Sequence, residues 1–166
     1  MNHAHLRQLV LTVLFSLVAK VSMAQQTPSY IPTEENLKAR QEFADSKLGI
    51  FIHWGIYSMF AQGEWYMTNA NIDNKEYAKA ASAFYPVNFD AKAWVSAIKA
   101  AGAKYICFTS RHHDGFSMWN TAQSDYNIVD ATPFGRDVIK ELADECHRQG
   151  IKLHLYYSHI DWTRDD

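Results

Sequence analysis

The stretch KYICFTSRHHDGFSMW, residues Lys104–Trp119, decides the fold. It begins with a continuous apolar run, Tyr105–Phe108, which is typical of a strand covered on both faces of a parallel sheet. Five hydrogen-bonding or ionisable side chains follow in residues 110–114, and Gly115 then allows a sharp turn. Because α/β folds gather their binding groups at the carboxyl ends of strands, this loop is the first candidate for a functional site.

Two further apolar runs also end in polar and aromatic residues. Leu48–Gly55 reaches His53 and Trp54, and Ile151–Tyr157 ends in two tyrosines. The spacing of apolar residues between these strands predicts helices at Lys75–Ala83, from a cap at Asn88 or Asp90 to Gly102, and at Asp137–Gln149. This succession predicts a parallel sheet with right-handed crossovers.

Such an alternation fits either an open doubly wound sheet or a barrel. The barrel is favoured because His53-Trp54-Gly55 is not the glycine-rich phosphate-binding fingerprint of the open fold. We therefore predict an α/β fold, the amino-terminal part of a (β/α)8-type, TIM-like barrel. A complete barrel needs about 250 residues. The 166 residues are expected to supply about three of its strands, so the barrel is expected to be incomplete in this chain.

The amino terminus resembles an export signal. His3, His5 and Arg7 precede an apolar run at residues 9–18, and Ala24 offers a small residue before a cleavage site. A membrane anchor is the alternative, but the run is shorter than the roughly 20 residues that span a bilayer. We predict a signal peptide at 1–24, an extended mature terminus at 25–33, and the truncated first part of a catalytic domain at 34–166. The protein is expected to be periplasmic or extracellular, with no stable membrane span after signal cleavage.

Composition narrows the possible ligands. With 16 Lys and Arg against 18 Asp and Glu, the net charge is −2, so nothing indicates a nucleic-acid partner. An aromatic content of 14% beside polar loops favours a ring-shaped ligand such as a carbohydrate. The flanks of the two cysteines, Cys107 and Cys146, predict buried free thiols rather than a disulfide.

From about Glu34 onward the chain closely resembles the amino-terminal part of the family 29 α-L-fucosidases, which are retaining exo-glycosidases that release terminal fucose. Four stretches in the right order carry the resemblance: Leu48–Gly55, Gly63–Tyr66, Arg111–Phe116 and Leu155–Ser158. The resemblance implies a fucosylated oligosaccharide or glycoconjugate as substrate, and no cofactor. Nothing in it indicates the oligomeric state.

The resemblance also implies which residues bind fucose: His53, Glu64, Trp65, His112, His113, and one tyrosine of the Tyr156-Tyr157 pair, with Tyr157 preferred. Fucose is neutral, so imidazole and carboxylate groups suit its hydroxyls, and an aromatic wall suits its methyl group and C–H face. The alternatives are a buried structural histidine at position 53 and an ordinary surface glutamate at position 64.

The adjacent histidines also suggest a metal site, which we reject because neighbouring residues on a strand point to opposite faces. A retaining glycosidase needs two carboxyl groups about 5 to 5.5 Å apart. In the family these lie on later parts of the fold, so no catalytic residue is assigned in this chain and both are expected beyond Asp166. The chain is then the front of a full-length fucosidase, a truncated product, or a non-catalytic fucose-binding module.

Overall fold

The computed structural model describes residues 30–164, so the predicted signal peptide lies outside the described residues. The chain falls into two units that divide between Gln41 and Glu42, within helix α2 (Glu34–Asp45). The predicted start of this helix is confirmed, because the main-chain N–H of Asn36 donates to the Thr33 hydroxyl at 3.2 Å. No helix in residues 30–164 is long and apolar enough to cross a membrane.

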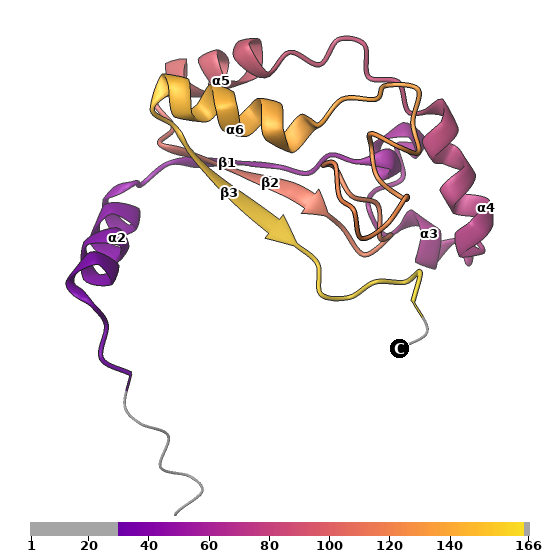
Figure 1. The fold of residues 1–166 in the computed structure, drawn as a ribbon, viewed down its shortest axis with the longest axis horizontal. Helices are drawn as coiled ribbons and strands as arrows, with labels where there is room; N and C mark the ends of the chain where they lie inside the picture. Colours follow the sequence, from indigo (N-terminus) through magenta and orange to yellow (C-terminus); the bar gives the residue numbers. More distant parts are fainter. Residues whose placement is uncertain (1–29, 165–166) are drawn as a thin grey trace, which may run out of the picture. The chain divides into compact units, whose positions relative to one another are not determined.

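Three parallel strands form the sheet, as the sequence predicts (Figure 1). They are β1 (Gly49–Ile52), β2 (Tyr105–Arg111) and β3 (Lys152–Tyr157), in the order β1-β2-β3. An irregularity interrupts the pairing of β2 with β3, because Thr109 lies opposite Tyr156 while Arg111 lies opposite Tyr157. Because all three strands are parallel, their carboxyl ends and the polar residues that follow them lie at the same end of the sheet.

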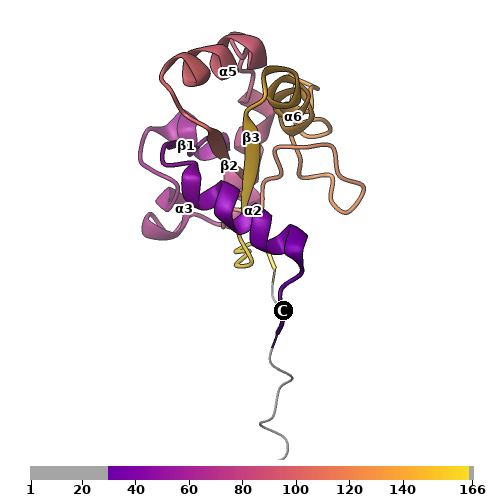
Figure 2. The ribbon, with the colours of Figure 1, turned by 90° about the vertical axis from the view of Figure 1, so that its left-hand side faces the viewer.

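Helices α5 (Ala91–Ala100) and α6 (Val138–Gln149) lie side by side over one face of this sheet (Figures 1 and 2). Asp90 begins α5, since its carboxylate accepts from the N–H of Ala93 at 3.0 Å, and Asn88 is not the cap. Asp137 begins α6 in the same way, and Gly150 ends it with φ of 72°. The predicted helix boundaries are thus confirmed by their caps.

The long first crossover contains four short helices instead of the single predicted one. They are η1 (Ile56–Phe60), α3 (Tyr66–Asn69), α4 (Asn74–Ala78) and η2 (Lys79–Ala83). In Figure 1, α3 and α4 lie beyond the carboxyl ends of the strands. The crossover therefore brings residues 63–66 to the same end of the sheet as the polar loops.

Apolar residues of the strands and helices form one core. Ile106 and Phe108 of β2 are fully buried against the helices, which contribute Val95 and Leu142. Cys146 belongs to this core as predicted, whereas Cys107 is only half-buried, and both thiols are free. Because side chains alternate along a strand, the neighbours of Ile106 and Phe108 face away from the helices.

The ring of Tyr105 lies directly over Gly49 on that second face of the sheet. A Cβ at position 49 would lie 2.1 Å from the Cζ atom of Tyr105, so the ring would have to move. The ring also packs against His154 at a centroid distance of 4.9 Å. We expect Gly49→Ala to lower the free energy of unfolding by about 1–3 kcal/mol, the usual cost of overpacking, measured by urea titration.

Removing the ring provides the control for this effect. In a protein that already carries Tyr105→Ala, adding Gly49→Ala should cost much less, because no ring then occupies the space. An equal cost in the two backgrounds would show that the ring contact is not the cause.

Candidate functional site

The carboxyl end of β1 is held against β2 by the hydroxyl of Thr109. This oxygen accepts from the N–H of Trp54 at 3.0 Å and lies 3.1 Å from the carbonyl oxygen of Trp54. The phenol of Tyr57 lies 3.0 Å from the same hydroxyl. The same hydroxyl also lies 3.3 Å from the carbonyl oxygen of Ile52. The main chain is therefore held on both sides of His53, the residue between the strand and the loop.

His53, Glu64 and His112 come together from three separate segments. Each offers one nitrogen or oxygen atom, and these atoms all lie within 4.8 Å of one another. His53 is exposed, so the alternative of a buried structural histidine does not hold, whereas His112 is only 4% exposed. The three side chains provide several hydrogen-bonding groups around one point.

Burial decides the charge of His112. Burial is the largest cause that lowers the pKa of this imidazole to about 4, the nearby imidazoles of His113 and His53 contribute to the fall, and Glu64 opposes it. The ring is therefore neutral near pH 7 and can donate through one nitrogen and accept through the other. Its Nδ1 atom is buried and has no hydrogen-bond partner within the described chain.

Two imidazoles and a carboxylate are also a set of donors that zinc accepts. The opposite orientation of neighbouring side chains disfavours a metal between His112 and His113, whereas the structure groups His112 with His53 and Glu64. These three residues come from separate segments, so that orientation does not exclude a metal between them. The expectation of no metal stays a prediction, and removal of divalent ions tests it.

Aromatic rings line one side of the cluster. The ring of Trp65 meets the ring of His113 edge-on at a centroid distance of 5.2 Å. Trp162 packs against both rings, at 5.2 Å from Trp65 and 5.1 Å from His113. Trp162 was not among the predicted site residues, although its place just beyond the third strand end is a signal that could have identified it.

The structure separates the two tyrosines at the end of β3. The ring of Tyr156 stacks on His112 at 5.6 Å and lies 6.1 Å from the ring of His53. Tyr157 is 45% exposed, and its hydroxyl accepts from Arg111 at 2.8 Å. The fold thus brings together five of the six predicted residues and adds Tyr156. A sugar contact by Tyr157 stays a prediction, but the geometry favours Tyr156.

Arg111 ties the loop after β2 to the segment after β3. Its Nε atom donates to the carbonyl of Gly115 at 3.1 Å, and its Nη2 atom forms an ion pair with Asp161. The side chains are 17% and 8% exposed, so the pair is largely shielded from water. This ion pair keeps the residues that flank the candidate site in place.

Breaking this pair should cost far more than breaking an exposed one. We expect Asp161→Ala to lower the free energy of unfolding by about 2–3 kcal/mol, because Arg111 loses its shielded partner. Glu76→Ala is the control, since its ion pair with Lys79 is exposed and such pairs contribute about 1 kcal/mol or less. Similar losses for the two variants in urea titrations would contradict the assignment.

Asp114 directly follows the histidine pair in the chain and is 1% exposed. Its Oδ1 atom accepts from the N–H of Phe116 at 3.2 Å, while Oδ2 has no partner within the described chain. Burial raises the pKa of this carboxyl to about 7, although the Phe116 bond and the charge of Arg111 oppose the rise. The loop that carries the two histidines therefore contains a carboxyl group whose pKa lies near neutral pH.

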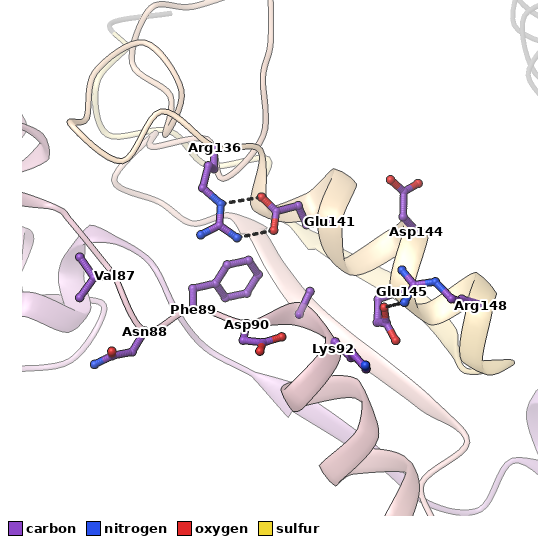
Figure 3. Close-up of a pocket in the computed structure, with 11 residues that line it drawn as sticks. Val87, Asn88, Phe89, Asp90, Lys92, Arg136, Glu141, Asp144, Glu145 and Arg148 are labelled. Carbon is purple, nitrogen blue, oxygen red and sulfur yellow. Dashed lines mark hydrogen bonds and ion pairs between the residues drawn. The ribbon is translucent and has the colours of Figure 1, made fainter.

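A separate hollow of about 680 Å³ lies between the start of α5 and the outer side of α6 (Figure 3). Two ion pairs lie along it: Arg136 with Glu141, at 2.8 Å, and Arg148 with Glu145. The guanidinium of Arg136 also lies 4.7 Å from the centroid of the Phe134 ring. None of the predicted site residues lines this hollow, so it is separate from the candidate site at the strand ends.

The strand-end cluster has the composition of a carbohydrate site. Imidazoles and a carboxylate can pair with hydroxyls, and indole rings suit the C–H face of a sugar. This combination of side chains is typical of sites that bind carbohydrates. The chain belongs to the Alpha-L-fucosidase family, whose model matches residues 17–166.

Individual relatives agree with this assignment. The chain is 34% identical over 181 residues to an alpha-L-fucosidase of Dictyostelium discoideum, covering 93% of this chain and 38% of that protein. It is 36% identical to the human plasma alpha-L-fucosidase, covering 84% of this chain and 34% of that protein. The chain therefore spans a little over a third of the length of these relatives.

Solved structures of fucosidases share the fold. An alpha-L-fucosidase of Lactobacillus casei in complex with alpha-L-fucose matches with a TM-score of 0.71 and 43% identity, over 75% of this chain and 41% of that one. Isoenzyme 1 from Paenibacillus thiaminolyticus matches with a TM-score of 0.72 and 46% identity, over 75% of this chain and 29% of that one.

Proposed function

We propose that the full-length protein is an exported α-L-fucosidase that hydrolyses terminal α-L-fucose from fucosylated glycans. The observation that carries this proposal is the convergence of His53, Glu64 and His112 beside an aromatic wall. The family of the chain supports fucose as the sugar. A related fucosidase has been solved with Fuca(1,6)GlcNAc, which supports a fucosylated oligosaccharide as the substrate class.

In this proposal the cluster binds and orients the sugar. The polar groups of His53, Glu64 and His112 pair with its hydroxyls, and Trp65 and Trp162 cover an apolar face. A sugar that lacks one of these hydroxyls would leave buried polar atoms unpaired, which provides specificity. Fixed hydrogen bonds of this kind also hold the anomeric carbon in a reactive position.

Hydrolysis would proceed with retention of configuration. One carboxylate attacks the anomeric carbon and displaces the glycan, which takes a proton from a second carboxyl group, and water then releases the sugar. We assign these two carboxyl groups to the part of the relatives' length that this chain does not span. The sugar-binding residues of this chain do not replace them.

The three parallel strands would form part of a (β/α)8 barrel. The similarity to solved fucosidases over three quarters of the chain supports this architecture. So does the exposure of Phe51, which is 52% accessible on the face of the sheet away from α5 and α6. Large apolar side chains on a strand are expected to be covered by further layers.

The test is hydrolysis of 4-nitrophenyl α-L-fucopyranoside by the full-length protein, with the corresponding β-D-galactoside as control. We expect fucoside turnover that survives EDTA, and a first-formed product with the α configuration, followed by proton NMR. Binding of fucose without turnover would overturn the hydrolase proposal in favour of a fucose-binding module. Loss of activity with EDTA would overturn the expectation of no metal.

A further inference from the structure

The ring of His113 is held in one orientation by the segment that follows β3. The N–H of Trp162 donates to the carbonyl of His113 at 2.8 Å, so this segment is bonded to the histidine main chain. The rings of Trp65 and Trp162 pack on the imidazole at 5.2 and 5.1 Å. Rotation of the imidazole would disturb both contacts.

Ser158 is the hydrogen-bond partner of this imidazole. Its side chain is buried. Its main-chain N–H donates to the carbonyl of Arg111 at 3.0 Å, and this bond holds Ser158 next to the end of β2. The Ser158 hydroxyl bonds to Nδ1 of His113 and also donates to the carbonyl of Ile160 at 2.6 Å.

These two bonds leave one arrangement of protons. A serine hydroxyl has a single hydrogen, and the carbonyl of Ile160 can only accept, so that hydrogen belongs to Ile160. Towards His113 the Ser158 oxygen must then accept, which requires a proton on Nδ1 of His113. In the neutral ring the remaining nitrogen, Nε2, carries a lone pair.

We propose that Ser158 is a positioning residue that holds His113 in the Nδ1-protonated form, so that Nε2 accepts a hydrogen bond from a substrate hydroxyl. The substrate part of this inference rests on the proposed function. Without Ser158 the imidazole can exchange its tautomers, and the Nε2-protonated form cannot accept that bond. The polarity of one sugar contact is thus fixed by a residue that does not touch the sugar.

The test uses NMR of the full-length protein with ¹⁵N-labelled histidine at pH 8, where imidazoles are largely neutral. The ring signals are assigned by their loss in His113→Asn. We expect Nδ1 of His113 to be protonated and Nε2 to be unprotonated. Ser158→Ala should produce a mixture of tautomers, and Ser158→Thr, which keeps the hydroxyl, should restore the single form.

Kinetics provide the second measurement. We expect Ser158→Ala to lower kcat/KM for the fucoside about tenfold, by analogy with the hydrogen-bond partners that orient metal-binding histidines, and Ser158→Thr to recover most of the loss. Ser110→Ala is the matched control, because Ser110 is also a buried serine that donates to a carbonyl, that of Tyr156, at 2.7 Å. It should leave the His113 signals unchanged.

An unprotonated Nδ1 in the unmodified protein, or unchanged tautomers in Ser158→Ala, would overturn the inference. Its failure differs from failure of the proposed function, because the NMR measurement needs no sugar. A protein with the expected tautomer but no fucoside turnover would refute the hydrolase and still support the role of Ser158.

Discussion

His53→Ala is expected to lower kcat/KM for an α-L-fucoside by about 100- to 1,000-fold, the range found when one preorganised hydrogen-bonding group is removed. The imidazole lies at the end of β1 within 4.8 Å of the binding atoms of Glu64 and His112. Under the proposed function, its loss removes one sugar contact and also leaves Glu64 and His112 without a neighbour that orders the bound hydroxyls. Initial rates over a range of fucoside concentrations measure the effect.

His147→Ala is the matched control for this prediction. His147 lies exposed on α6 and is not among the residues of the strand-end cluster. Because His53 is itself exposed, neither substitution should lower the free energy of unfolding much. A similar loss of activity in the two variants, or a large loss of stability in His53→Ala, would contradict the assigned role of His53 in binding.

The strands and helices could be predicted because local sequence carries their signals. The apolar run at β2, the caps Asp90 and Asp137, and the terminating Gly150 each act within a few residues of their own position. The parallel order of the sheet then follows from the alternation of strands and helices. These features need no knowledge of distant contacts.

The choice between Tyr156 and Tyr157 could not be made in this way. Neighbouring residues on a strand face opposite sides, so the sequence indicates that one tyrosine faces the site but not which one. The answer depends on the register with β2, and that register is interrupted between Thr109 and Arg111. Only the paired strands reveal that Tyr156 shares the site with His112.

The grouping of His53 and Glu64 around His112 also could not be predicted from the residues next to His112 in the sequence. The sequence drew attention to His113 because it is adjacent, yet the structure also groups His112 with His53 and Glu64, which precede it by 59 and 48 residues. The crossover folds Glu64 back over the strand ends. The proton on Nδ1 of His113 likewise depends on Ser158 and Ile160, which follow it by more than forty residues.

Asp114 makes the stability of this region depend on pH. Burial raises the pKa of its carboxyl from 3.8 to about 7 in the folded protein. Below about pH 4 the folded and unfolded states are both protonated, so the group costs nothing. As the pH rises from 4 to 7, only the unfolded chain releases the proton, and the folded state loses stability relative to it.

The full cost, reached above about pH 7, is about 4 kcal/mol at 1.4 kcal/mol for each pKa unit. Asp114→Asn keeps the shape of the protonated carboxyl but cannot ionise, so it should escape this cost. We expect the free energy of unfolding of Asp114→Asn, relative to the unmodified protein, to rise steadily between pH 4 and pH 7 and then level off. Urea titrations at intervals of one pH unit measure this difference.

Asp125→Asn controls for the loss of one carboxyl group, because Asp125 is exposed in the loop that follows. The buried phenols of Tyr77 and Tyr126 would keep their protons throughout, since burial raises the pKa of each. The phenol of Tyr77 also interacts with Asp114 and opposes part of the rise in the pKa of that carboxyl. Free energies of unfolding of Asp114→Asn and the unmodified protein that differ by the same amount at every pH would contradict the prediction. Asp114 would then ionise as readily in the folded protein as in the unfolded chain.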